Sequence, residues 1–129
     1  MFQLDGIDHV ALRVRDTARA AAWYIEVLGF ERRHEGMWGG VPVFLGRGNT
    51  ALALFPARDG EGTALRGASK RSGMLHLAFR ATRRNFIAAQ TDLRQREIAF
   101  EFQDHGISHS IYFHDPDGHE LEITTYEVS

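Results

Sequence analysis

Two histidines and one glutamate in this sequence form a candidate set of metal ligands. His9 and His76 stand at the same place in two similar segments, and Glu122 lies in a later apolar stretch. Two imidazoles with one carboxylate suit iron(II), manganese or zinc and leave coordination positions open for a substrate. A single histidine on a strand is more often a hydrogen-bonded polar residue. The repeated position of the pair, together with Glu122, favours a metal site.

The two similar segments are strands of an internal repeat. Gly, His, Ala and Arg recur with the same spacing in residues 6–13 (GIDHVALR) and 73–80 (GMLHLAFR). Both segments alternate in polarity and are rich in branched and aromatic residues, which indicates strands. A helical pattern follows each segment. The first helix is capped by Asp16 or Thr17, runs over 18–28 and stops at Gly29; the second runs over about 83–96.

Three short strands follow each predicted helix, so each half is a βαβββ module. They are predicted at about 30–35, 41–45 and 50–55 in the first half, and at 98–103, 108–114 and 119–125 in the second. The fold class is α+β, with modules at about 5–55 and 73–126 in a single domain of 129 residues. Residues 56–72, rich in charge, glycine and small residues, are interpreted as a connector.

Alternation along the strands predicts the face on which each candidate ligand lies, because successive side chains point to opposite faces of a sheet. The residues expected to pack under the helices are Val10, Leu12, Val14, Leu77, Phe79, Ile111, Phe113, Leu121 and Ile123. His9, His76, Tyr112 and Glu122 then fall on the open faces, as does Ser110. We therefore expect polar residues of four strands to line the concave space that two modules enclose.

Composition restricts the possible classes of function. The chain has no cysteine, which excludes disulfides and thiolate chemistry. Lys and Arg total 15 against 17 Asp and Glu, a balance that argues against nucleic acid or a membrane surface as partner. No apolar run approaches the roughly 20 residues of a membrane span, and the first residues lack the pattern of a signal peptide. We expect a cytoplasmic protein that acts on a small molecule.

The sequence resembles the vicinal oxygen chelate superfamily, which includes glyoxalase I, bleomycin-resistance proteins, extradiol dioxygenases and fosfomycin-resistance enzymes. The resemblance is carried by residues 7–14 (IDHVALRV), 23–30 (WYIEVLGF), 75–79 (LHLAF) and 110–123 (SIYFHDPDGHELEI). It implies a cup-shaped mixed sheet around a divalent metal that chelates two adjacent oxygens, with His9, His76 and Glu122 as ligands. Residues 115–118 (DPDG) predict a type I turn. The family's glutamate ligand follows the glycine of that turn by four residues, which selects Glu122 over Glu120.

Two alanines narrow the choice within the superfamily. Glyoxalase I has a fourth protein ligand on the last strand of the first half, where alignment of the two halves places Ala53 opposite Glu122. A methyl group cannot bind a metal, so glyoxalase I activity is not expected. Fosfomycin-resistance enzymes have a catalytic hydroxyl two residues after the first histidine, where this chain has Ala11. They also have a C-terminal arginine segment that this sequence lacks.

The extradiol dioxygenases match best. Residues 103–112 (QDHGISHSIY) resemble the stretch in which a histidine and a tyrosine of these enzymes contact the catecholate, here His105 and Tyr112. Asn49 is the nearest residue to their other acid/base histidine, and the chain is half their length. The resemblance favours a ring-cleaving dioxygenase with Fe²⁺, while Mn²⁺ and Zn²⁺ stay open. The alternatives are a drug-sequestering protein of the bleomycin-resistance type and a lyase or transferase of the glyoxalase or fosfomycin-resistance type.

The resemblance also implies a homodimer with shared metal sites. His9 of one chain would meet His76 and Glu122 of the other, although closure within one chain stays open. The four histidines without an assigned role are expected to be solvated or to support the ligands; they are His34, His109, His114 and His119.

Overall fold

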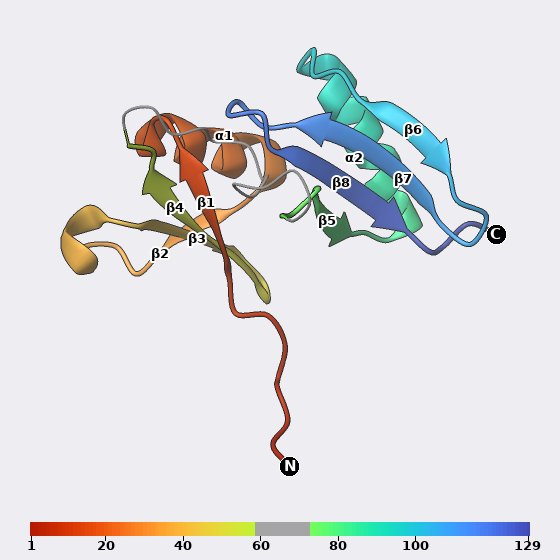
Figure 1. The fold of residues 1–129 in the computed structure, drawn as a ribbon. Helices are drawn as coiled ribbons and strands as arrows, with labels where there is room; N and C mark the ends of the chain where they lie inside the picture. The colour runs from red at the N-terminus through yellow and green to blue at the C-terminus, as the bar shows by residue number, and fades with distance from the viewer. Residues whose placement is uncertain (59–72) are drawn as a thin grey trace. The chain divides into compact units, whose positions relative to one another are not determined.

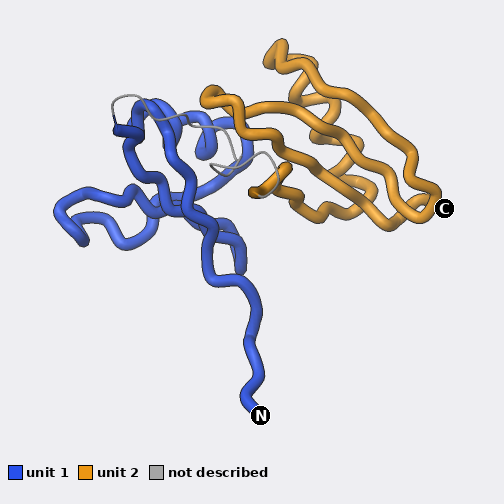
Figure 2. Tube along the Cα trace, in the orientation of Figure 1, with its two compact units in different colours: residues 1–63 blue, residues 64–129 orange. Residues whose placement is uncertain are grey.

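The computed structural model describes residues 1–58 and 73–129. The chain divides into two compact units, unit 1 within residues 1–63 and unit 2 within residues 64–129 (Figure 2). Most of the predicted connector, 56–72, lies outside the described residues.

Unit 1 is a βαβββ module (Figure 1). Its strands are ordered β1-β4-β3-β2, with β1 parallel to β4 and the other neighbours antiparallel. The elements are β1 (Val10–Val14), α1 (Thr17–Leu28), β2 (Glu31–Arg33), the 3-10 turn η1 (Trp38–Gly40), β3 (Val43–Arg47) and β4 (Thr50–Pro56).

Unit 2 repeats the same topology, with the strand order β5-β8-β7-β6 and a parallel β5–β8 pair. Its elements are β5 (Leu77–Arg80), α2 (Arg83–Gln95), β6 (Glu101–Asp104), β7 (His109–His114) and β8 (Glu120–Thr125). The parallel pairs also match in register, since Val10 pairs with Leu52 and Leu77 pairs with Leu121. The predicted α+β fold of two βαβββ modules is confirmed.

The residue before each helix caps its N-terminus through its side chain. The Asp16 carboxylate accepts a hydrogen bond from the Arg19 backbone N–H at 3.1 Å, and the Thr82 hydroxyl accepts one from the Asn85 N–H at 3.2 Å. These bonds satisfy amide donors that the first turn of a helix cannot pair. Helix α1 ends at Gly29, which has a left-handed φ of 74°. Asp16 is therefore the cap, and the predicted stop at Gly29 is correct.

Two strands begin two or more residues later than predicted. The strand expected at 41–45 begins at Val43, because η1 occupies Trp38–Gly40 and the Val41 N–H bonds back to the Trp38 carbonyl. The strand expected at 98–103 begins at Glu101. After α2 the chain turns through Glu97 at φ 59°, and the Ile98 N–H bonds back to the Leu93 carbonyl. The apolar residues that precede Val43 and Glu101 resemble strand residues in sequence, but they do not pair with a neighbouring strand.

Each sheet buries one face against its helix, as alternation predicts. In β1, Leu12 and Val14 are buried while Ala11 and Arg13 are exposed. The buried apolar side chains of unit 2 include Phe86, Leu93, Ile111, Phe113 and Leu121. The opposite faces are left to the candidate site residues. No helix in residues 1–58 and 73–129 is long and apolar enough to cross a membrane.

Candidate metal and substrate site

The polar face of unit 2 is organised by the turn between β7 and β8. The Gly118 N–H bonds to the Asp115 carbonyl at 3.1 Å, which confirms a turn over residues 115–118. The Asp115 carboxylate also accepts two backbone N–H bonds within this loop. The turn sets the register of the hairpin, in which Tyr112 pairs directly with Glu122. Directly paired residues share a face, so Tyr112 and Glu122 lie side by side.

His76 and Glu122 are in direct contact. The Nε2 atom of His76 lies 2.9 Å from Oε1 of Glu122, and the Glu122 side chain is only 10% exposed. The Ser110 hydroxyl donates to the other carboxylate oxygen of Glu122 at 2.7 Å. A buried carboxylate needs such partners, because burial without them is costly. The orientation of Glu122 is therefore fixed by Ser110 on one side and His76 on the other.

Tyr112 and His105 form a second contact beside this pair. The Tyr112 hydroxyl lies 3.0 Å from Nε2 of His105, and the Tyr112 ring meets the His76 ring edge-on with centroids 5.7 Å apart. Burial, and secondly the negative charge of Glu122, raises the pKa of Tyr112 above its usual value. The phenol is protonated at neutral pH, as an ordinary tyrosine is, and the raised pKa extends this further into the alkaline range. Four predicted site residues, His76, His105, Tyr112 and Glu122, are thus brought together in unit 2.

His9 lies in unit 1, immediately before β1. Its Nδ1 atom is 2.8 Å from Oδ2 of Asp8, and its ring meets the Phe44 ring edge-on at 5.4 Å. A carboxylate on one imidazole nitrogen fixes the tautomer and directs the other nitrogen towards a ligand, an arrangement common in metal sites. Nε2 of His9 is therefore the nitrogen suited to bind a metal.

The donor atoms of unit 2 fit a divalent metal. Two ligand atoms at about 2.1 Å from one metal and at right angles to each other lie roughly 3 Å apart, close to the 2.9 Å between His76 and Glu122. Ser110 and Asp8 supply the supporting hydrogen bonds that ligands of this kind need. Among the described residues, no three His, Cys, Asp or Glu side chains stand together as a ready metal cluster. The third predicted ligand, His9, belongs to the other unit.

Ala53 and Phe44 take the places of Glu122 and Tyr112 in unit 1. Ala53 pairs with Phe44 on β4 and β3, as Glu122 pairs with Tyr112 on β8 and β7. The predicted alignment of Ala53 with Glu122 therefore agrees with the register, and this position of unit 1 offers no metal ligand.

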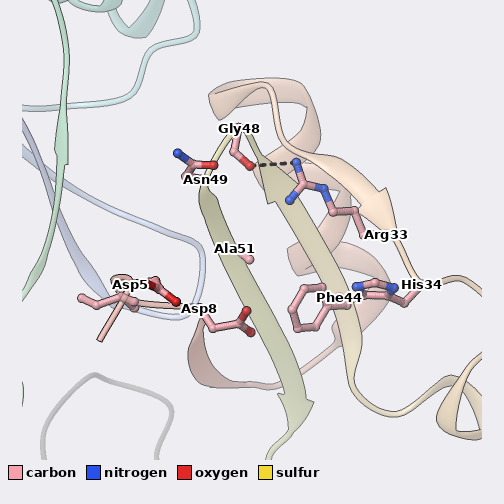
Figure 3. A pocket seen from close by; sticks show the side chains of 9 residues that line it. Asp5, Asp8, Arg33, His34, Phe44, Gly48, Asn49 and Ala51 are labelled. Atoms are coloured by element: carbon pink, nitrogen blue, oxygen red, sulfur yellow. Dashed lines mark hydrogen bonds between the residues drawn. The ribbon is translucent and has the colours of Figure 1, made fainter. Parts of the chain in front are cut away.

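Three further residues stand at the candidate site or at a pocket without having been predicted there from the sequence. Ser110 was placed on the open face, but its bond to Glu122 was not foreseen; its position two residues before Tyr112 was the available signal. Arg33 and Asn49 line a pocket of about 340 Å³ on unit 1 (Figure 3). The sequence singles out Asn49 only as the residue nearest to the position of an acid/base histidine, and no sequence signal distinguishes Arg33 from other arginines.

The four unassigned histidines have different surroundings. His114 is exposed, as expected, and Nε2 of His109 lies 3.5 Å from an Asp104 carboxylate oxygen. His34 packs edge-on against Phe44 with centroids 5.0 Å apart. The expectation that His119 is solvated or supports a ligand is wrong in its first part, because only 1% of this residue is exposed.

Comparisons with known proteins agree with this architecture. The family model described as Glyoxalase/Bleomycin resistance protein/Dioxygenase superfamily matches residues 6–123, which include every predicted site residue. A solved glyoxylase/bleomycin resistance protein/dioxygenase domain from Frankia sp. EAN1pec is 28% identical, with a TM-score of 0.75 over 95% of this chain and 98% of that chain. No curated protein matches the chain in sequence.

Two further solved structures bear on the fold alone, because their identity to this chain is low. Lactoylglutathione lyase from Agrobacterium tumefaciens is 24% identical, with a TM-score of 0.74 over 97% of this chain and 96% of that one. The fosfomycin resistance protein FosX from Listeria monocytogenes is 17% identical, with a TM-score of 0.71 over 94% of this chain and 91% of that one.

Proposed function

The chain belongs to the Glyoxalase/Bleomycin resistance protein/Dioxygenase superfamily, and on that premise we propose that it is a divalent-metal enzyme. Its ligands are His9, His76 and Glu122, and its substrate is a small molecule with two neighbouring oxygens. The observation that carries the proposal is the 2.9 Å contact of His76 with Glu122, whose second oxygen is held by Ser110. Two imidazoles and one carboxylate with open positions are the ligand set of iron(II) oxygenases, so Fe²⁺ is favoured, with Mn²⁺ and Zn²⁺ as alternatives.

The reaction we propose is ring cleavage of a catechol-type substrate by O2. The metal would supply open positions for the two substrate oxygens and for O2. Tyr112, whose phenol is protonated at neutral pH, would donate a hydrogen bond to one substrate oxygen. His105, whose Nε2 lies 3.0 Å from the Tyr112 hydroxyl, would take up or return a proton, since imidazole exchanges protons near neutral pH.

The matching test is O2 consumption with a panel of catechols, measured after anaerobic loading with Fe²⁺. We expect O2 uptake and the absorbance of a ring-opened product for at least one catechol. Tyr112→Phe should lower kcat about 10²-fold or more while Fe²⁺ binding is retained, because loss of one positioned hydrogen-bond donor to a reacting oxygen costs on that scale. Fe²⁺ binding without turnover of any catechol would contradict the dioxygenase proposal. Tight binding of a drug-like ligand without any metal would instead favour the sequestering alternative.

We also propose that the metal site is shared in a homodimer, with His9 of one protomer meeting His76 and Glu122 of its partner. A two-fold axis makes both sites equivalent. The test mixes His9→Ala with Glu122→Ala protein under conditions that exchange subunits. Each heterodimer would then contain one intact site, so part of the metal binding should return. No recovery despite demonstrated exchange would contradict the shared site.

A further inference from the structure

The pocket on unit 1 contains none of the three proposed metal ligands in its lining. Its volume is about 340 Å³, at the lower end of the roughly 300–1,000 Å³ typical of small-molecule sites. Arg33 and Phe44 lie on its wall, and Phe44 also contacts the His9 ring, so the pocket adjoins this proposed metal ligand. Its size suits a ligand with a single ring.

The Arg33 guanidinium lies over Gly46, which has no side chain and so leaves room for it. A β-carbon at Gly46 would collide with the Arg33 guanidinium, and the φ of Gly46 does not lie in the left-handed region. Space for Arg33, rather than backbone conformation, is therefore what the glycine provides. One guanidinium nitrogen of Arg33 donates to the Gly48 carbonyl at 3.1 Å. The side chain is thus positioned before any ligand arrives.

Most of the hydrogen-bonding capacity of Arg33 is left for a ligand. A guanidinium has five N–H donors in a planar fork, and the bond to Gly48 uses one of them. Within residues 1–58 and 73–129, no carboxylate forms an ion pair with Arg33. Asp5 and Asp8 line the pocket away from the Arg33 head group (Figure 3), and Asp8 is bonded to His9.

An aromatic wall stands beside the guanidinium. Arg33 pairs directly with Phe44 across β2 and β3, so the two side chains share a face. The Phe44 ring also meets His34 and Trp38, with centroid distances of 5.0 and 6.1 Å. A planar ring could pack against this wall while a group attached to it reaches Arg33.

We propose that this pocket binds an aromatic carboxylic acid, whose carboxylate is held by Arg33 and whose ring packs on Phe44. Guanidinium and carboxylate match in geometry and form paired, charge-assisted hydrogen bonds. The proposal rests on the proposed function in one respect: it makes the catechol-type substrate a carboxylated one. Binding of the acid to the pocket itself needs no metal.

The test uses benzoate as the probe and benzamide as its uncharged counterpart, with metal-free protein and NMR titration. We expect benzoate to bind about tenfold or more tightly than benzamide, the scale of a hydrogen bond to a charged group. Arg33→Gln should remove that preference. Arg32→Gln, which makes the same charge change at the neighbouring position, should preserve it. Equal binding of the two probes, or undiminished benzoate binding by Arg33→Gln, would overturn the proposal.

A second variant guards against misfolding and against confusion with the metal proposal. Gly46→Ala keeps the charge of Arg33 but displaces its guanidinium, so it should weaken benzoate binding as Arg33→Gln does. Circular dichroism confirms that each variant is folded. Fe²⁺ affinity of Arg33→Gln should equal that of the unaltered protein. Loss of metal binding by His76→Ala with intact benzoate binding would separate the two sites, and a Gly46→Ala protein that binds benzoate normally would contradict the role of Arg33.

Discussion

The two units have the same strand order and register but different chemistry on their open faces. Unit 2 carries a buried carboxylate, Glu122, paired with a phenol, Tyr112. At the same two places unit 1 carries a methyl group, Ala53, and an apolar ring, Phe44. The repeated fold therefore fixes where side chains stand, and a few residue differences decide which half carries a buried carboxylate and which half carries the pocket lined by Arg33 and Phe44.

The supports of the two histidines differ in the same way. His76 contacts Glu122, itself a proposed ligand, whereas His9 contacts Asp8, which precedes it in the chain. The residue of unit 2 equivalent to Asp8 is Leu75. Each unit thus orients its histidine with one carboxylate, but only in unit 2 does that carboxylate also belong to the proposed ligand set.

Removing the carboxylate that distinguishes unit 2 should have the largest effect. Glu122→Ala should lower Fe²⁺ affinity by more than about 100-fold, the upper range seen when only a supporting residue is lost. Chelator competition measures this affinity. Glu120→Ala removes the same group from the same strand two residues away and serves as the control, with affinity within a few-fold of the original. Similar affinities for the two variants would contradict the assignment of Glu122.

Giving unit 1 the carboxylate of unit 2 should destabilise the metal-free protein. Ala53 is only 1% exposed. Ala53→Glu should therefore lower the free energy of unfolding by about 2–4 kcal/mol, because the new carboxyl group is buried without hydrogen-bond partners. Ala11→Glu, at the exposed residue that pairs with Ala53, should change it by about 0.5 kcal/mol or less. Denaturant unfolding checks both values. An Ala53→Glu protein as stable as the original would show that this position tolerates charge.

Ser110→Ala should weaken the site without removing a ligand. The hydroxyl donates to Glu122 at 2.7 Å, and loss of such a supporting bond costs about 10–100-fold in metal affinity. Ser108→Ala, at another buried serine two residues earlier, is the matched control and should leave metal affinity unchanged. An equal loss in both variants would point to general destabilisation of β7.

The smallest effect concerns the Tyr112 phenol in the metal-free protein. Its pKa is raised by burial and then by Glu122, so Glu122→Gln should lower that pKa, and Glu120→Gln should lower it less. Absorbance of the phenolate during alkaline titration, with Tyr112→Phe as the blank, measures the change. A raised pKa also means that Tyr112 contributes stability below its ordinary pKa of 10.0, and that this contribution is lost as pH rises through the folded value. An unchanged pKa in Glu122→Gln would contradict the proximity of the two groups.

Alternation and the internal repeat are sufficient to predict the two modules and the shared face of Tyr112 and Glu122. The cap of the first helix is narrowed only to Asp16 or Thr17, and the cap of the second, Thr82, is not predicted. Tyr112 and Glu122 are predicted to lie on one face because successive side chains of a strand point to opposite faces, which can be counted along the sequence. The strand starts at Val43 and Glu101 were missed, because the backbone turns at η1 and at Glu97 are set by bonds to residues earlier in the chain.

Alternation predicts the face on which a side chain lies, but not the distances between side chains on that face. The bond from Ser110 to Glu122 depends on the hairpin register, which the turn at 115–118 fixes. Arg33 was overlooked because its position depends on the space above Gly46, which only the folded sheet defines. The burial of His119 could not be predicted either, because this residue lies just before β8, where alternation along a strand does not apply.

We propose that each metal site takes one ligand, His9, from a unit 1 and two ligands, His76 and Glu122, from a unit 2, so removal of His9 is the most direct test. The measurement is Fe²⁺ stoichiometry per chain under chelator competition, for the original protein and for His9→Ala. We predict one Fe²⁺ per chain in the original and loss of that metal in His9→Ala, with the fold retained by circular dichroism. Full retention of Fe²⁺ by folded His9→Ala would contradict the account, because His76 and Glu122 would then hold the metal without unit 1.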